Sequence, residues 1–449
     1  MKKKIWLLWL IALVGIILIG GSLSAGLFDE QPVADINDIL RTIRLCPAVP
    51  GTYLVVGVIY NPNIDRYVVF VLERRKKSDR LYSRLYNTKG GATTNFRKVI
   101  DFNSWVGYMD VVFNPRDNLF FLVGGDNYFS EINGAVFSGD GLLIGGEEDY
   151  IQIKPDTGSG SAIFPQVNWI ETTNQYTVHW VHYDWQNPDN YVNGQYLSLL
   201  NGDFSFAVKK RKVRQQSMRN YLHYAKVLPL DDGLLWTSGE DGPGARNRPV
   251  VWFTNFRGKI RYDIPYSSGG IIHPSGAGDG HGLVTAVYNA ADDNFLLHWN
   301  EANSPWNSEQ IYAVNRYRIM ERSGKFLGPW QEVPKKSPFQ TAGVIVHNSV
   351  ENRYFCVFPE YNRHIPKEYK YQVGGKLWGV YMDNMGNLEA KNGIKKWAPI
   401  PLTDLYTNKL YELEFNGMTF NYDRNEYLNF YSIYNTANNT YRCWGSIFQ

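Results

Sequence analysis

The sequence predicts an all-β protein, a seven-bladed β-propeller with four-stranded antiparallel blades whose ring is closed by an N-terminal strand that completes the last blade. Three observations predict it. An apolar run, a turn of Asn, Asp or Pro, and a second apolar run opened by an aromatic residue or Leu return together seven times in 449 residues. Aromatic residues make up 15% of the chain, which favours strands. Convincing amphipathic helices are missing between these phrases, which argues against parallel βαβ folds.

The repeated phrase is clearest in AVYNAADDNFLLHW, residues 286–299, and in VIYNPNIDRYVVFVL, residues 58–72. Seven copies at one period indicate a repeat architecture. The fourth copy, VLPLDDGLLWTSGED (227–241), is the weakest because its turn lacks Asn. The residues that open the second strand of each copy are separated by 52, 57, 58, 61, 59 and 73 positions: Tyr67, Leu119, Tyr176, Leu234, Phe295, Tyr354 and Tyr427.

Two further candidate strands follow each phrase, as in residues 195–213 and 249–264, and a Gly-containing turn typical of hairpins joins them. One unit is therefore four antiparallel strands, and such units stacked around an axis form a propeller. Both faces of each sheet are then covered, which explains why YVVFVL (67–72) is continuously apolar. A two-sheet sandwich is the alternative fold, and it would not need seven units of similar length.

The seventh unit stops after three strands, at TYRCWGSIFQ (440–449), whereas the segment DILRTIRLCPAVP (38–50) resembles a strand without a blade. We expect this segment to complete the last blade, because no blade edge is then left open. Cys46 and Cys443 would lie on neighbouring strands, which makes them a disulfide candidate in an exported protein. Buried, reduced cysteines are the alternative.

The N-terminus carries three lysines, an apolar run from Ile5 to Gly21 and then small residues, which is the pattern of an export signal. Residues 1–25 are expected to be either a cleaved signal peptide, cut after Ser24, or a retained membrane anchor, because the run is nearly long enough to span a bilayer. Residues 26–37 would be a linker and residues 38–449 the propeller. The protein is thus expected to be secreted or at the cell surface, touching the membrane only through an uncleaved N-terminal segment.

The charge balance argues against a nucleic-acid partner. Without Lys2, Lys3 and Lys4, the 46 basic residues fall to the number of acidic ones, 43, so the exported part is neutral. The basic runs ERRKKSDR (73–80) and KKRKVRQQ (209–216) are interpreted as solvated loops or as strand edges whose charge discourages edge-to-edge pairing.

The loops of such a ring divide between two rims. The short turns inside the phrases share one rim, here called the turn rim, and the loops between strands two and three and between blades share the opposite, long-loop rim. Long loops on a rigid scaffold are usual binding sites, and aromatic faces beside hydrogen-bonding groups suit sugar rings or a protein partner. The candidate ligand-binding residues are Tyr183, Asp184, Trp185, Glu240, Arg246, Trp299, Asn300, Glu301, Trp306, Glu360, Tyr361 and Arg363.

Catalysis is the weaker hypothesis. A glycosidase needs two carboxyl groups about 5–10 Å apart, and the rim acids of successive blades offer candidates, but no catalytic residue is assigned. His273, Asp279 and His281 lie in a Gly-rich loop that imposes no ligand geometry, and neither a metal nor a cofactor is expected. His179, His223 and His298 fall inside strands and are interpreted as satisfied core residues. Packing of loop against loop is the non-functional explanation for the rim aromatics.

The seven phrases, of the type V-x-x-N-x-x-x-x-N-x-[YFL]-hydrophobic-x-W, resemble the blade repeats of exported bacterial β-propeller proteins over roughly Asp38 to Gln449. The Trp-Asp ending of WD repeats, the double Gly of kelch blades and the Ser-x-Asp-x-Gly turn of sialidases are absent. Five-bladed carbohydrate-active enzymes are similar in blade style, but their blade number differs, so no catalytic residue is carried over.

The resemblance concerns architecture and implies no activity. From the residues, we expect an extracellular or cell-surface binding module for a glycan or a surface protein. A carbohydrate-active enzyme, either a glycoside hydrolase or a lyase, and a scaffold in a cell-envelope assembly are the alternatives.

Overall fold

The described residues form strands throughout the ring. The computed structural model describes residues 39–48, 51–76, 78–102, 106–126, 131–146, 149–155, 161–183, 193–216, 222–242, 246–261, 284–302, 313–333, 343–360, 363–364, 372–373, 376–389, 400–401, 411–435 and 440–448. Within these ranges no helix has the length and apolarity needed to cross a membrane.

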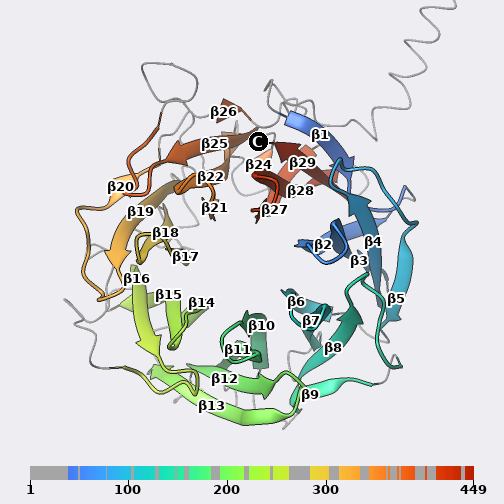
Figure 1. Ribbon diagram of the computed structural model, residues 1–449, viewed down its shortest axis with the longest axis horizontal. Coiled ribbons are helices and arrows are strands. Elements are labelled where there is room, and N and C mark those ends of the chain that lie inside the picture. The colour runs from blue at the N-terminus through green and yellow to red at the C-terminus, as the bar shows by residue number, and fades with distance from the viewer. Residues whose placement is uncertain are drawn as a thin grey trace, which may run out of the picture.

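Seven antiparallel sheets lie around a common axis as the blades of a propeller, and the first strand of each blade is nearest the axis (Figure 1). Blade 1 contains β2 (Thr52–Asn61), β3 (Arg66–Arg74), β4 (Asp79–Asn87) and β5 (Arg97–Asp101). Blade 2 contains β6 (Val106–Asn114), β7 (Leu119–Asp126), β8 (Ile132–Ser138) and β9 (Ile151–Lys154). Blade 3 contains β10 (Ser161–Ile170), β11 (Gln175–Tyr183), β12 (Asn193–Asn201) and β13 (Phe206–Gln216). The predicted fold class is confirmed.

Blade 4 has three described strands, and blade 6 carries an additional small hairpin. Blade 4 contains β14 (Leu222–Pro229), β15 (Leu234–Gly242) and β16 (Arg246–Thr254). Blade 5 contains β17 (Thr285–Asn289), β18 (Asn294–Ala302), β19 (Ala313–Glu321) and β20 (Gln331–Glu332). Blade 6 contains β21 (Val344–Asn348), β22 (Arg353–Glu360), β25 (Lys376–Met382) and β26 (Ile400–Pro401), with β23 (Arg363–His364) and β24 (Gln372–Val373) forming the hairpin. Blade 7 contains β27 (Tyr411–Asn421), β28 (Glu426–Asn435), β29 (Thr440–Phe448) and β1 (Ile39–Arg44).

The ring is closed by the two ends of the described chain, as predicted. β1 is the outermost strand of blade 7 and pairs with β29, with Ile39 opposite Phe448 and Arg44 opposite Trp444. This pairing, here called the seam, gives the last blade its fourth strand. Figure 1 shows β1 in blue against the red strands of the C-terminus.

The two seam cysteines lie next to each other as free thiols in the core. The Leu45 N–H donates to the Cys443 carbonyl (2.9 Å), so that Leu45, and not Cys46, lies opposite Cys443. The Cys443 N–H donates to Cys46 Sγ (3.3 Å), and the Cys443 thiol donates to the Tyr53 carbonyl (3.0 Å). The predicted proximity is present, whereas the bond itself stays a prediction.

Each pair of neighbouring blades buries an apolar cluster between its sheets. Between blades 1 and 2, the Phe70 ring lies 5.4 Å from Phe120 and 5.2 Å from Phe137, both edge-to-face. In β3 the run from Tyr67 to Leu72 is buried throughout, because side chains of both faces meet a neighbouring blade. Burial on both faces therefore explains the unbroken apolar runs in the sequence.

The first turn of each blade explains the Asn and Asp of the phrase. Its last residue has a left-handed backbone, which Asn and Asp adopt at a lower cost than other residues with a side chain. These residues, with φ between 49° and 53°, are Asp65, Asn118, Asn174, Asp293, Asn352 and Asn425. Blade 4 instead closes its turn with Gly233, whose carbonyl accepts from the Leu230 N–H (2.8 Å).

The pairing of strand one with strand two shows that two residues of the predicted repeat are shifted by one position. Tyr67 lies opposite Tyr60 in blade 1, and the equivalent pairs are Phe120 with Phe113 and Leu235 with Leu228. The position of Tyr67 is therefore taken by Phe120 and Leu235, not by Leu119 and Leu234. The error arose because Leu precedes another apolar residue in both copies.

A buried Asn at the end of strand one holds each of five blades to the next blade. Asn114 Nδ2 donates to Asn174 Oδ1 (3.0 Å) and to the Tyr176 hydroxyl (2.8 Å) of blade 3. Asn421 Nδ2 of blade 7 donates to the Tyr67 hydroxyl (3.2 Å) of blade 1. The five inter-blade asparagines are Asn61, Asn114, Asn289, Asn348 and Asn421. The phrase recurs because these contacts recur.

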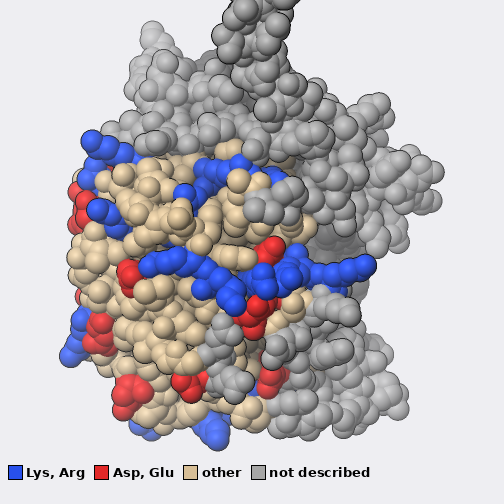
Figure 2. All heavy atoms as spheres, turned by 90° about the vertical axis from the view of Figure 1, so that its right-hand side faces the viewer, with Lys and Arg blue, Asp and Glu red and all other residues tan. Residues whose placement is uncertain are grey.

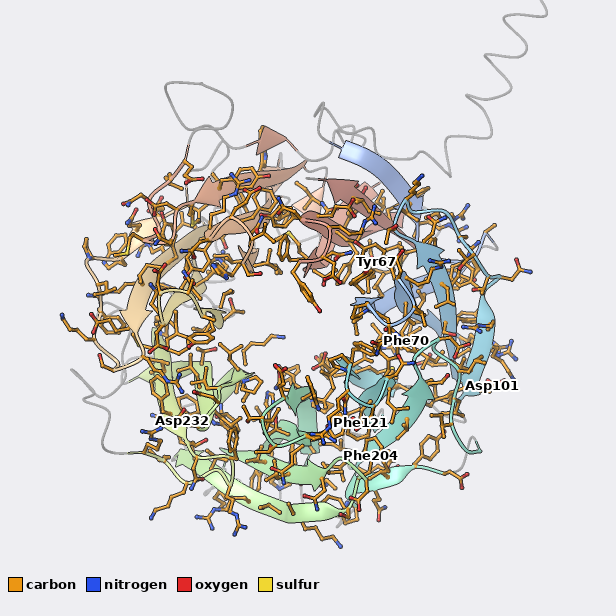
Figure 3. The ribbon with its side chains drawn as sticks, in the orientation of Figure 1. Tyr67, Phe70, Asp101, Phe121, Phe204 and Asp232 are labelled. Atoms are coloured by element: carbon orange, nitrogen blue, oxygen red, sulfur yellow. The ribbon has the colours of Figure 1, made fainter. Side chains whose placement is uncertain are left out.

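The turn that follows strand three has a Gly with a left-handed backbone in five blades, and blade 3 is the exception. Gly90, Gly141, Gly258, Gly324 and Gly386 have φ between 74° and 84°. In blade 3 the corresponding residue is Phe204, with φ of 63°. Its ring stacks on Tyr176 (5.1 Å) and lies 5.0 Å from Phe121, next to which it is seen in Figure 3. Aromatic packing thus offsets the backbone cost at Phe204.

Candidate binding site at the long-loop rim

The predicted site residues that are described lie in blades 3 to 6 and come from the ends of strands at the long-loop rim. Asp184, Trp185, Trp306 and Tyr361 lie outside the described residues, and the side chains of the others, except Trp299 and Asn300, do as well. The backbone positions are the end of β11 for Tyr183, β15 for Glu240, the start of β16 for Arg246, β18 for Glu301, the end of β22 for Glu360 and β23 for Arg363.

Glu240 and Arg246 were expected in a long rim loop, but most of the segment 238–249 that contains them is strand. Glu240 pairs with Arg248, and Gly242 with Arg246, so β15 and β16 are joined by a three-residue connection. The Gly and Pro content of the segment suggested a loop, but both residue types occur in a hairpin close to its turn. Glu240 and Arg246 are therefore positioned by ladder pairing.

Trp299 does not present its ring at the rim, which corrects the expectation for this residue. It is 2% exposed and packs in the cluster between blades 4 and 5. The strand continues three residues beyond it, to Ala302, so Trp299 is a strand residue that faces a neighbouring blade. Asn300 is half-buried, and its Nδ2 donates to the Val314 carbonyl (3.4 Å).

Below the rim, blades 3, 4 and 5 contain a group of buried polar side chains. His179, Ser238 and His298 occupy the same position of strand two in successive blades, opposite Gln166, Ala225 and Thr285. The other four blades place apolar residues there: Phe70, Val123, Val357 and Phe430. The group, here called the polar layer, comprises the buried His179, Gln195, Thr237, Ser238, His298 and Asn315 together with the half-buried Gln166.

In blade 3 the polar layer is bonded to blade 4. His179 Nε2 lies 3.2 Å from Gln166 Oε1 and 3.3 Å from the Ala225 carbonyl, so Nε2 is the nitrogen that carries the proton. Gln195 Nε2 donates to Ser238 Oγ (3.3 Å). Burial lowers the pKa of His179 to about 3, and its imidazole is therefore neutral at physiological pH.

The same layer continues into blades 5 and 6. Thr237 Oγ1 donates to the Val284 carbonyl (2.8 Å). Asn315 Oδ1 lies 3.1 Å from His298 Nε2 and accepts from the Gly343 N–H (3.1 Å). Burial lowers the pKa of His298 to about 4. Polar contacts therefore join four successive blades directly beneath the predicted site.

Several buried polar atoms in blades 3 and 4 have no hydrogen-bond partner within the described part of the chain. Such atoms are rare in native proteins, and leaving one unpaired costs about 1–3 kcal/mol. They include Thr177 Oγ1, His179 Nδ1, Gln195 Oε1 and Trp252 Nε1. Atoms of this kind also occur in blade 7, for example Asn421 Oδ1 and Asn429 Nδ2, so they do not single out this sector of the rim.

The sequence alone did not reveal the polar layer. His179 and His298 were interpreted as satisfied core residues, which holds for His298, whose two ring nitrogens have neighbours at 3.1 and 3.5 Å. The available signal was a polar residue inside an otherwise apolar strand two, repeated in three consecutive units. Among the described residues no group of three His, Cys, Asp or Glu side chains is placed to hold a metal ion, and the loop with His273, Asp279 and His281 lies outside them.

Comparisons with known proteins assign no family. The chain matches no family model and no curated protein. Prolyl oligopeptidase B from Galerina marginata is 9% identical with a TM-score of 0.43, over 86% of this chain and 47% of that one. An oligogalacturonate lyase in complex with manganese is 9% identical with a TM-score of 0.47, over 93% and 96% of the chains. Levansucrase from Bacillus subtilis is 11% identical with a TM-score of 0.38, over 67% and 87%.

The chain spans about half the length of the prolyl oligopeptidases it matches. At these identities and TM-scores, the activities of those proteins carry no argument for this one. The class that the strands and blade contacts define is the seven-bladed β-propeller. No narrower family is assigned.

Proposed function

We propose that the protein is an extracellular or cell-surface binding module that recognises a glycan through the long-loop rim of blades 3 to 6. One observation carries the proposal: candidate residues of successive blades come from strand ends at a single rim, above a polar layer that occurs in the same sector. Hydrogen-bonded strands hold the backbones of such residues in fixed relative positions, so the protein loses less conformational entropy when a ligand binds. In the sequence, amide, carboxylate and guanidinium side chains are close to aromatic residues in these segments, and this composition matches the hydroxyls and apolar faces of sugars.

Export is part of the proposal and rests on the N-terminal segment. A cleaved segment would release the module, and a retained one would hold it at the cell surface. Fractionation of producing cells, with detection of the N-terminal and C-terminal ends by separate tags, distinguishes these states. Recovery of the full-length chain in the cytosol would contradict export.

The binding test is a polysaccharide panel read by calorimetry, with reducing-sugar release measured in parallel. We expect one or more glycans to bind without release. The rim variant E240Q/E301Q should bind at least tenfold more weakly, whereas E321Q/E389Q, which alters two acids on the turn side of blades 5 and 6, should bind as the wild type does. A panel without any bound glycan, or equal binding by both variants, would overturn the proposal.

A carbohydrate-active enzyme is the second candidate, favoured by the placement of three acidic residues at strand ends of successive blades: Glu240, Glu301 and Glu360. Release of reducing sugar that disappears in E240Q or E301Q would establish it. A protein ligand on the same rim would instead be revealed by binding of a surface protein that the rim variant loses.

A further inference from the structure

The outermost strand of blade 3 is unusually basic. β13 pairs with β12 and has no other neighbour among the described strands of its sheet. Five of the six residues from Lys209 to Arg214 are Lys or Arg. A regular strand would turn alternate side chains inward, but the β12–β13 register shifts three times, and four consecutive cations are exposed: Lys209, Lys210, Arg211 and Lys212. These four residues are here called the basic strand.

Aromatic rings beneath support these cations. Lys210 Nζ and Lys212 Nζ lie 5.0 and 5.9 Å from the centre of the Tyr196 ring, and the Arg214 guanidinium lies 4.7 Å from the Trp252 ring of blade 4. Ring faces attract cations, and the long side chains pack their stems on apolar surface while the charged ends stay in water. The array thus has a defined place across the outer wall of blades 3 and 4.

The outer wall of blade 1 shows what a neutralised basic surface looks like. Figure 2 displays a band of basic side chains over the side where β4 and β5 lie, with acidic side chains beside it. Ion pairs explain this: Arg80 and Lys98 lie 3.1 and 3.4 Å from Asp101, which is at the outer wall in Figure 3. No described carboxylate lies within ion-pair distance of Lys209, Lys210 or Arg211, so the described acidic side chains do not neutralise these three cations.

Protection of a sheet edge does not by itself require this composition. A single lysine is enough to discourage edge-to-edge pairing, and like charges placed next to one another repel. Four adjacent exposed cations therefore point to an anionic ligand. About four residues of extended strand span roughly 13 Å, which suits an elongated anion with repeated charges.

The strand direction favours a soluble polymer over a lipid surface. Phe206 pairs with Leu200 near the turn rim and Gln216 with Asn193 near the long-loop rim, so the basic strand leads towards the proposed binding rim. β1 begins at Ile39, opposite Phe448 and hence on the turn side. A retained N-terminal anchor would therefore enter at the rim opposite to the one that the basic strand approaches.

We propose that the basic strand binds a linear acidic polysaccharide, whose chain runs along the outer wall of blade 3 to the long-loop rim. This proposal rests on the proposed glycan-binding function and specifies its ligand class. Neutralisation of several carboxylates releases bound counterions, so affinity must fall as salt rises. Lys and Arg on the wall supply this charge-dependent part of binding, and the rim supplies recognition of the sugar rings.

The experiment compares two charge-matched variants of the full chain. K209Q/K210Q/R211Q/K212Q removes the basic strand, and K89Q/K98Q/K259Q/K325Q removes four exposed cations elsewhere. Alginate is the acidic probe, and dextran, anionic phosphatidylglycerol vesicles and duplex DNA are the comparisons. Calorimetry at 50 and 200 mM salt should show alginate binding that weakens about tenfold at the higher salt. The basic-strand variant should bind alginate at least tenfold more weakly, and the matched variant within twofold of the wild type.

Each other outcome overturns the inference. Equal alginate binding by both variants excludes the basic strand, and binding of vesicles or DNA as tight as that of alginate shows attraction for any polyanion or a different ligand class. Dextran bound as tightly as alginate removes the acidic specificity but leaves the proposed function, whereas absence of binding to any polysaccharide removes both. Near-UV circular dichroism checks folding, and the milder K210Q/R211Q variant should show an intermediate loss.

Discussion

Replacement of Asn348 by Ala tests whether the inter-blade asparagines hold the ring together. Asn348 is fully buried at the end of β21. Its Nδ2 donates to Asn425 Oδ1 (2.7 Å) and to the Tyr427 hydroxyl (2.9 Å) of blade 7. Its Oδ1 accepts from the backbone N–H groups of Val350 (2.9 Å) and Glu351 (3.0 Å). One side chain thus closes its own turn and joins two blades.

The expected loss of stability for N348A is about 3 kcal/mol. Four hydrogen bonds contribute about 0.5–1.5 kcal/mol each, and partners left buried without a bond add a desolvation cost. Water that enters at the turn rim would satisfy some of those partners, which keeps the estimate in the lower half of the summed range.

Urea unfolding followed by tryptophan fluorescence measures this loss, and a double-mutant cycle isolates the inter-blade part. N348A, Y427F and the double variant should give a coupling of about 1 kcal/mol, because the bond between residues 348 and 427 is lost only once. N63A is the matched control: Asn63 is at the turn rim too, but its bond to the Pro115 carbonyl (2.9 Å) is exposed. It should change stability by less than about 0.5 kcal/mol.

The reverse substitution tests the same reasoning. Ile170 occupies the Asn position in blade 3 and packs with Leu234 and Trp236 of blade 4. I170N should destabilise by about 2–3 kcal/mol, because an amide would be buried among apolar side chains. If N348A behaves like N63A, or if I170N stabilises the protein, the asparagines are not the inter-blade contacts described here.

Three further results are expected. Burial holds the pKa of His179 near 3, whereas a histidine of the unfolded chain titrates near 6.5. As the pH falls, the unfolded state therefore binds the proton first, and the free energy of unfolding should fall by about 2 kcal/mol between pH 6.5 and pH 5. A pH dependence of urea unfolding that H179Q leaves unchanged would contradict this. Mild oxidation of the wild type by oxidised glutathione should reduce the titratable thiols from three to one and raise stability by about 4–5 kcal/mol, whereas C443S should keep two thiols; three thiols after oxidation would remove the seam disulfide. G141A should cost about 2 kcal/mol in urea unfolding, because Gly141 has φ of 75° and a Cβ there would lie 2.9 Å from Val68 Cγ1; a loss below 0.5 kcal/mol would refute it.

The blade architecture could be predicted because its main determinants are local and repeated. An Asn or Asp in a left-handed turn position, followed by an apolar strand, is visible in single copies such as residues 289–297. The seam was predictable for a different reason: the last unit lacked a strand, and residues 38–50 supplied one. Neither inference required knowledge of which blades touch through which side chains.

The site was less predictable because it depends on contacts between blades. Nothing in the sequence shows that His179 faces the Ala225 carbonyl of the next blade, since the two residues are in separate units. Trp299 was wrongly expected in the rim loop because the sequence does not show where the strand ends. The strand continues to Ala302, so the Trp299 side chain packs between blades instead of lying in the loop. Loop composition gave no warning that Glu240 and Arg246 belong to paired strands.

Closure of the ring by β1 and β29 determines when folding can be completed. Cys46 and Cys443 are separated by 397 residues yet touch, so the slowest step of folding should be the docking of β1 onto β29. Long-range contacts of this kind form late because chain closure is entropically costly. A chain that emerges N-terminus first would hold β1 unpaired until β29 is available, and we expect chaperones to bind residues 39–44 during that interval.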